Sequence, residues 1–129
     1  MRKVRAILID PFKCEVTEIE HDASDHRNIY PLLSHESMPV DCFTIVHLDD
    51  GDAIFVDDEG LLKPCERFFM WKGYHQPLAG KGLILGSDVR GDTQSCKITL
   101  AKTKKMVKHL EYLPGAGLIW TGIPWQPSK

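Results

Sequence analysis

The stretch from Asp41 to Gly60 reads DCFTIVHLDDGDAIFVDDEG. It contains two short apolar runs, 42–48 and 53–56, which are rich in β-branched and aromatic residues and are separated by an acidic turn. The pair Asp50-Gly51 suits the tight turn of a β-hairpin, because glycine adopts positive φ without steric cost. The stretch therefore predicts an antiparallel hairpin, which identifies a scaffold and not a chemistry.

The segments on either side of this hairpin predict further strands. An opening hairpin is expected from residues 4–9 and 14–19, because Asp10 and Pro11 between them are turn residues. Strands are also expected at 67–71 and 82–86, and an edge strand near 118–123. Ser24 can cap a short helix within residues 24–34, which Pro31 keeps short or kinked.

The longest helix is expected from Leu100 to Leu113, between a Thr99 cap and Pro114. Its apolar stripe consists of Leu100, Thr103, Met106, Val107 and Leu110. The sequence thus predicts one α+β domain over residues 1–129, with a Pro-containing tail at 123–129. Its largely antiparallel sheet of roughly five to seven strands would carry this long helix on one face, together with the short helix.

Composition excludes some classes of function. The chain has 129 residues, with 16 basic and 18 acidic side chains and a net charge of -2. That charge is too small for whole-protein attraction to nucleic acid, or for a DNA mimic. The four cysteines lie far apart without a Cys-x-x-Cys pair, so reduced thiols are expected. Because Arg5 interrupts the first apolar run, neither a signal peptide nor a membrane span fits, and we expect a cytoplasmic location.

No motif indicates a reaction, a metal or a cofactor. The acidic turns lack the spacing of a calcium loop, and the six histidines lack that of a zinc site. The glycines of 80–86 precede a strand, whereas a phosphate-binding loop follows a strand and opens a helix. We therefore expect no catalytic residues, no metal ligands and no cofactor, which favours a non-catalytic protein.

Two surfaces are candidates for binding. Consecutive aromatic residues near 68–74 cannot all face one core, because side chains alternate along a strand, so other elements or a partner must cover some of them. The expected ligand or partner site comprises Arg67, Trp71, Lys72, Tyr74, His75, Gln76, Lys81, Asp88 and Trp125. A nucleic-acid surface is the alternative on the opposite arc of the expected helix, from Lys102, Lys104, Lys105 and Lys108.

The chain resembles small phage and plasmid proteins that form a family of unknown function. The resemblance is carried by residues 73–88, which read GYHQPLAGKGLILGSD, by Gly91-Asp92-Thr93, and by the turn from Asp58 to Leu62. It extends roughly from Val4 to Leu110, and the tail after Pro114, with its two tryptophans, departs from the common pattern. The resemblance implies an accessory protein of a mobile element in a bacterial cytoplasm, and it supplies no catalytic residues.

Three hypotheses follow for the function. The first is a non-catalytic binding module that occupies the surface of a host or phage protein. The second is a protein or enzyme that binds a small ligand or nucleotide through the Gly/Pro-rich loop at 72–82. The third is nucleic-acid binding through the lysines. A concave pocket beside Tyr74 would favour the second hypothesis, and a flat apolar patch bearing Trp120 or Trp125 would favour the first.

Overall fold

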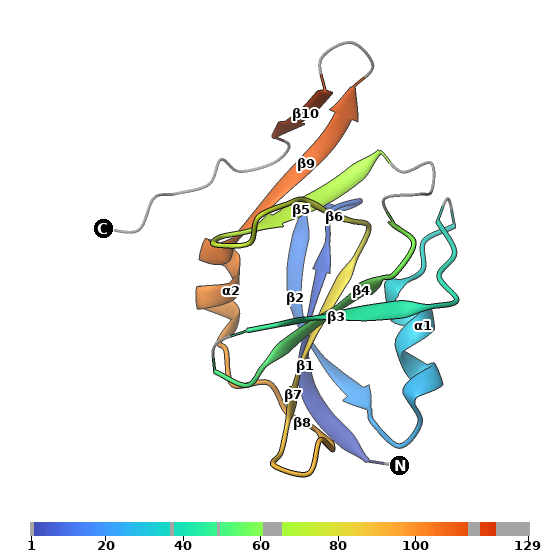
Figure 1. Cartoon of the computed structure of the whole chain (residues 1–129), viewed down its shortest axis with the longest axis vertical. Helices are drawn as coiled ribbons and strands as arrows, with labels where there is room; N and C mark the ends of the chain where they lie inside the picture. Colours follow the sequence, from blue (N-terminus) through green and yellow to red (C-terminus); the bar gives the residue numbers. More distant parts are fainter. Residues whose placement is uncertain (1, 37, 49, 61–65, 114–116, 121–129) are drawn as a thin grey trace.

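The computed structural model describes the chain except for residues 1, 37, 49, 61–65, 114–116 and 121–129. Its described strands form two antiparallel sheets (Figure 1). The larger sheet has the order β2-β1-β7-β4-β3, with β8 paired to β7. Its strands are β1 (Lys3–Asp10), β2 (Glu15–Asp22), β3 (Phe43–His47), β4 (Ala53–Asp57), β7 (Gly82–Ser87) and β8 (Thr93–Gln94). The smaller sheet has the order β10-β9-β5-β6 and contains β5 (Arg67–Trp71), β6 (Leu78–Ala79), β9 (Val107–Leu113) and β10 (Gly117–Trp120).

Both predicted hairpins are confirmed. β1 pairs with β2 from Lys3↔Asp22 to Asp10↔Glu15, and β3 pairs with β4 from Phe43↔Asp57 to His47↔Ala53. Gly51 has φ of 93°, which is the positive value expected of the glycine in this turn. Local turn chemistry therefore sets the register of both hairpins.

The predicted helix from Leu100 to Leu113 is wrong. Helix α2 covers only Leu100–Met106, and Val107 turns extended, with φ of -102° and ψ of 136°. Val107 is the first of the seven residues of β9, which pairs with β5 from Trp71↔Val107 to Arg67↔Glu111. The apolar residues after Met106 fit a helical stripe and a strand equally well, and the backbone hydrogen bonds offered by β5 decide in favour of the strand.

The predicted fold class, one sheet that carries a long C-terminal helix, is wrong for the same reason. The described residues form two sheets rather than one sheet under a long helix, with strand far exceeding helix. The short helix expected within 24–34 is present as a 3-10 turn η1 (His26–Asn28) followed by α1 (Ile29–Leu33). Its capping residue is Asp25 rather than Ser24, because the Asp25 side chain accepts from Arg27 N.

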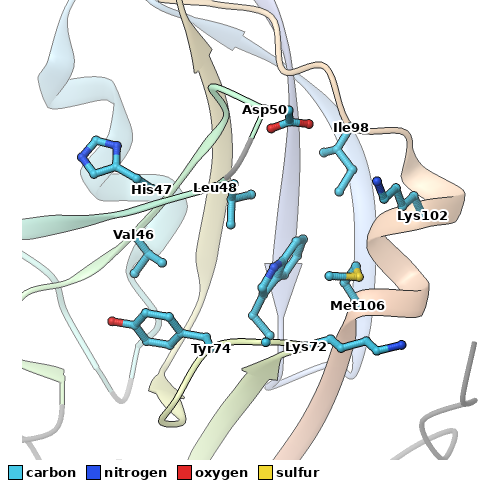
Figure 2. A pocket seen from close by; sticks show the side chains of 11 residues that line it. Val46, His47, Leu48, Asp50, Lys72, Tyr74, Ile98, Lys102 and Met106 are labelled. Atoms are coloured by element: carbon cyan, nitrogen blue, oxygen red, sulfur yellow. The ribbon is translucent and has the colours of Figure 1, made fainter.

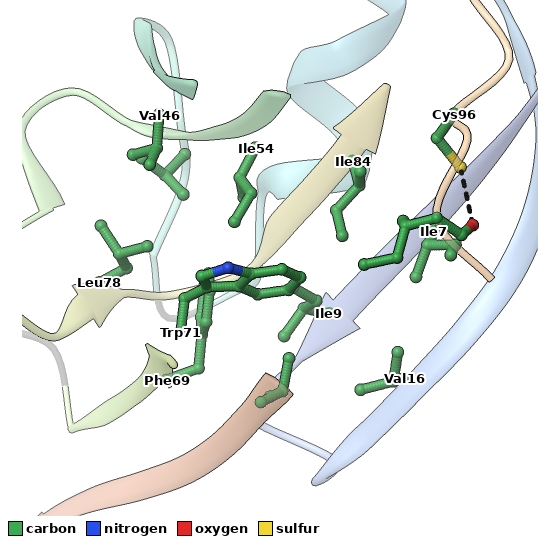
Figure 3. Packing of buried hydrophobic residues seen from close by; sticks show 13 residues of the cluster. Ile7, Ile9, Val16, Val46, Ile54, Phe69, Trp71, Leu78, Ile84 and Cys96 are labelled. Carbon is green, nitrogen blue, oxygen red and sulfur yellow. Dashed lines mark hydrogen bonds between the residues drawn. The ribbon is translucent and has the colours of Figure 1, made fainter. Parts of the chain in front are cut away.

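Two apolar clusters lie on opposite faces of the larger sheet. The inner cluster lies between the two sheets and joins Ile7, Ile54 and Ile84 to Phe69 and Trp71. Figure 3 shows the Trp71 indole in its centre, with Leu78 on one side and Ile9 on the other. The outer cluster packs α1 onto the other face through Ile29, Leu33, Val4, Ala6, Leu83 and Leu85. β7 is therefore buried on both faces, which fixes it as the central strand.

No helix in the described part of the chain is both long and apolar enough to cross a membrane.

Candidate functional site

Two adjoining pockets lie along β3, and together we call them the β3 groove. The larger has a volume of ≈ 260 Å³ and is lined by Val46 and His47 of β3, Leu48 and Asp50 of the turn that follows it, residues 71–74, Ile98, Lys102 and Met106. The smaller, of ≈ 160 Å³, is lined by residues 44–46, 56–58, Gly60, Tyr74 and residues 76–79. Val46 and Tyr74 line both pockets, so the two pockets adjoin at these side chains.

One wall of the larger pocket is held by a buried carboxylate. Asp52, 0% exposed, follows the β3–β4 turn and accepts hydrogen bonds from the backbone N–H of Lys97 at 2.9 Å and of Ile98 at 2.9 Å. Lys97 Nζ in turn donates to the carbonyl of Asp50 at 3.0 Å. Because charge-assisted bonds to a buried carboxylate are strong, Asp52 ties the approach to α2 onto the hairpin and holds Ile98 in the wall of the pocket.

The opposite wall is a tight turn after β5. Tyr74 N donates to the Trp71 carbonyl at 2.9 Å, and Gly73 between them has φ of 93°, a value that favours glycine. Lys72 N donates to the Met106 carbonyl at 2.9 Å, which fixes this turn against the end of α2. The Trp71 indole is buried, whereas Tyr74 is partly exposed at the mouth of the pocket.

Helix α2 supplies the third wall. Thr99 caps the helix by accepting from Lys102 N at 3.1 Å, and the Thr103 hydroxyl donates to the Thr99 carbonyl at 2.8 Å. Figure 2 shows Lys102 extending toward Ile98, and Lys72 running away beneath Met106. The pocket thus has a mixed lining, with apolar side chains such as Ile98 and Met106 beside the charged groups of Asp50, Lys72 and Lys102.

Carboxylates gather where the smaller pocket meets the first residues of β3. Desolvation first, and then the charges of Asp58, Glu59 and Asp41, raise the pKa of the Cys42 thiol, which donates weakly to Asp58 Oδ2 at 3.9 Å. The same three carboxylates are exposed to solvent. This end of the groove is therefore anionic, whereas the residues of β3 itself carry no carboxylate and no lysine.

Several predicted site residues meet in this groove. Trp71, Lys72 and Tyr74 line the larger pocket, together with Lys102 from the alternative set. Gln76 lines the smaller pocket. His75 lines neither of the two pockets but packs on Tyr74, with ring centroids 4.5 Å apart.

Other predicted site residues lie elsewhere. Arg67 points its guanidinium to the Pro11 carbonyl at 3.4 Å and to Glu111 at 3.8 Å, at the opposite end of β5 from Trp71. Asp88 accepts from Arg90 N and Asp92 N, so it organises the turn between β7 and β8. These hydrogen bonds, that of Asp92 first, lower the pKa of Asp88. Trp125 and the tail at 123–129 lie outside the described residues.

The lysines of the alternative surface do not share one helical face. Lys104 and Lys105 are exposed on α2, whereas Lys108 lies half-buried on β9. The continuous stripe predicted for them depended on the helix extending to Leu113, and α2 ends at Met106. Nucleic-acid binding by these residues stays a prediction.

Another polar cluster lies where the end of β1 meets the start of β7, and its residues line neither pocket of the groove. Asp10, 6% exposed, caps the β1–β2 turn through Phe12 N and Lys13 N, and its Oδ2 lies 3.8 Å from Lys81 Nζ. His109 on β9 is 9% exposed, and its Nδ1 has no hydrogen-bond partner among the described residues. Burial lowers the pKa of His109, against an opposing effect from the Asp10 charge. Lys81 therefore belongs to this cluster and not to the groove.

Sequence reasoning missed most of the groove walls. Val46, Leu48, Ile98 and Met106 are apolar residues whose types and spacing are those of ordinary core positions. The only available signal was the alternation along β3, which places residues 44, 46 and 48 on one face of the strand.

The chain matches the family model of the domain of unknown function DUF3846 over residues 2–111. It is also 30% identical, over 83 residues, to the uncharacterized protein y4iR of Sinorhizobium fredii (strain NBRC 101917 / NGR234). That alignment covers 64% of this chain and 49% of y4iR, so it spans about half the length of that relative. No solved structure matches the chain. Because the family model covers most of the residues, including both sheets up to β9, the chain belongs to the DUF3846 family of unknown function.

Proposed function

We propose that the protein is a non-catalytic binding module that holds side chains of a partner protein in the β3 groove. The observation that carries this proposal is the pair of adjoining pockets of ≈ 260 Å³ and ≈ 160 Å³ that share Val46 and Tyr74. Sites for drug-sized ligands usually have volumes of about 300–1,000 Å³. A pocket beside Tyr74 is the feature expected of a small-ligand site, but each of these two pockets is below that range, so its size suits one protein side chain better than a nucleotide.

The chemistry of the walls supports the same occupant. The larger pocket offers a guest the Trp71 indole, Met106 and other apolar groups, together with the charges of Asp50, Lys72 and Lys102. Tyr74 stands between the two pockets, and an aromatic ring in that position can pack on both sides at little cost in conformational entropy. An apolar side chain in each pocket would bury surface that is otherwise in contact with water.

We extend the proposal to an accessory role for a phage or plasmid in a bacterial cytoplasm. The support is the motif from Gly73 to Asp88, which resembles that of phage and plasmid proteins. The check is genomic. Genes that encode this motif should lie in prophages or on plasmids far more often than the average gene of the same hosts, and an even distribution would contradict the extension.

A selection experiment tests the binding function. A random 12-residue peptide library displayed on a carrier is selected on the full chain, and enriched sequences are remade as fluorescent peptides for anisotropy measurements. Tyr74→Ala should weaken their binding about 30-fold, because a buried aromatic anchor contributes about 2 kcal/mol.

The matched control is His75→Ala, which removes the ring packed on Tyr74 but lines neither of the two pockets. It should change affinity less than about threefold, which corresponds to the small effects typical of contacts outside a hot spot. Peptides that bind wild type and Tyr74→Ala equally, or a library that yields no binder, would contradict a binding site in the groove.

A further inference from the structure

The backbone of β3 has one side that the described strands leave unpaired. β3 is the last strand of the larger sheet, and only β4 pairs with it within the described residues. Leu48 N donates to the Asp52 carbonyl at 2.9 Å, and Asp58 N donates to the Cys42 carbonyl at 3.1 Å. Even-numbered residues of β3 therefore form the hydrogen-bonded pairs with β4, because such pairs alternate in an antiparallel ladder.

The odd-numbered residues consequently direct their backbone N–H and C=O groups away from β4. These residues are Phe43, Ile45 and His47, and they offer a row of donors and acceptors along the edge of the sheet. An extended chain can pair with such an edge by adding one strand to the sheet.

The two edges of the larger sheet differ in their protection. β2, at the other edge, carries Glu18 and Glu20, which form ion pairs with Arg5 at 2.7 Å and Lys3 at 2.9 Å. Charged side chains of this kind discourage the addition of a further strand. β3 reads FTIVH, without a carboxylate or a lysine, and its Ile45 is 39% exposed. The β3 edge therefore lacks the protection that β2 has.

The groove lies beside this same edge. Residues 44–46 of β3 line the smaller pocket and residues 46–48 line the larger one. In an added strand, alternate side chains would point to the groove side, at the spacing that separates Thr44, Val46 and Leu48. Backbone pairing and side-chain capture are therefore compatible in a single extended guest.

The charges at the end of the groove indicate the chemistry of the guest. Asp41, Asp58 and Glu59 gather around Cys42, at the residue that precedes β3. A lysine or arginine in the guest at that position would meet three exposed carboxylates, whereas an acidic residue would be repelled. The five residues of β3 span about 17 Å, which corresponds to a guest of about five or six residues.

We propose that β3 accepts an extended segment of a partner protein as an added strand, with uncharged residues along Phe43–His47 and a basic residue beside Asp41, Asp58 and Glu59. The inference rests on the proposed binding function, and it assigns to that function a binding mode and a class of partner. The enriched library peptides should accordingly alternate apolar residues with others and carry lysine or arginine near one end.

The decisive variant is Ile45→Pro. The Ile45 N–H points away from β4, so proline at this position leaves the β3–β4 ladder intact but removes a donor and blocks the edge. Binding of the selected peptides should weaken about tenfold, the order expected for a lost backbone hydrogen bond plus a steric block. Ile45→Thr, which keeps the N–H and the β-branched shape, is the matched control and should weaken binding clearly less than Ile45→Pro does.

Two further measurements leave the edge strand unchanged. Two versions of the peptide are made, one with N-methyl groups on its odd-numbered residues and one with them on its even-numbered residues. Only one version should bind more weakly, because only every second residue of an added strand directs its backbone N–H to β3. Asp58→Lys combined with Glu59→Lys should weaken binding about tenfold and reduce its salt dependence. The control Glu15→Lys, on the β2 edge, should change neither.

The possible results separate the two proposals. Loss of binding in Tyr74→Ala, with no effect of Ile45→Pro or of N-methylation in either phase, would keep the groove as the binding site and overturn strand addition. Peptides that are insensitive to Tyr74→Ala but sensitive to Ile45→Pro would overturn the groove and keep the edge. If the wild type sediments as a dimer and Ile45→Pro as a monomer, the β3 edge is occupied by a second copy of this chain. That result would overturn the assignment of the edge to a partner protein.

Discussion

Replacing Asp52 with alanine should destabilise the protein more than any other single change of a carboxylate in the β3–β4 turn. Asp52 is 0% exposed and accepts from two backbone amides, Lys97 N and Ile98 N. Hydrogen bonds to charged groups contribute about 1.5–3 kcal/mol each. Lys97 is exposed, so its amide can bond water after the substitution, whereas the amide of buried Ile98 stays unsatisfied. The expected loss is therefore about 3 kcal/mol rather than the full sum of two bonds.

Urea denaturation followed by circular dichroism measures this loss as a fall in the unfolding midpoint at constant slope. Asp52→Asn keeps one acceptor oxygen and should lose about half as much. Asp50→Ala is the neighbouring control, because Asp50 is exposed and its carboxylate accepts from Asp52 N at 3.2 Å, so it should cost less than about 1 kcal/mol. If Asp52→Ala cost no more than Asp50→Ala, the carboxylate would not be what holds the approach to α2, and our account of the pocket wall would fail.

Three other perturbations test the fold. The pKa of His109 in the folded protein lies below its usual 6.5, so between the two values the unfolded chain binds more protons than the folded one. The free energy of unfolding, measured by urea titration, should therefore decline as the pH falls from about 6.5 toward 5. His109→Leu should reduce the decline, and an identical decline in this variant would contradict the role of His109. Gly51→Val should cost about 1–3 kcal/mol, because a β-branched residue is strained at φ of 93°, and a near-neutral thermal melt would refute that turn geometry. Thr99→Ala should cost about 1 kcal/mol through loss of the cap on α2, measured by the same melt, whereas no change would show that the cap does not stabilise the helix.

The parts of the fold that could be predicted are those with local causes. The Asp50-Gly51 turn and the flanking apolar runs specify β3 and β4 within about 20 residues of sequence. The end of α2 at Met106 has a distant cause, because β9 forms only where β5 is available to pair with it. A single sequence does not reveal that partner, and the apolar spacing after Met106 fits both structures.

The candidate site was predictable to a similar extent. Trp71, Lys72 and Tyr74 are neighbours in sequence, so one turn brings them together. Arg67 and Trp71 share a face of the smaller sheet, but they lie four positions apart along β5, which is a distance of about 13 Å. Lys81 and Asp88 lie at opposite ends of β7, whose six residues span about 20 Å, so they cannot share one small site. This separation follows only once residues 82–87 are known to form a strand.

The central place of β7 also has consequences for how the chain folds. β1–β2 and β3–β4 are local hairpins that can form as soon as each has left the ribosome, but the strand that joins them comes later in the sequence. Until residues 82–87 are available, each hairpin exposes apolar surface that the finished sheet buries. The slow step of folding should therefore be the insertion of β7 between two preformed hairpins, a closure over long loops whose entropic cost delays it. During that interval both hairpins are exposed to chaperones and to misassociation with other nascent chains.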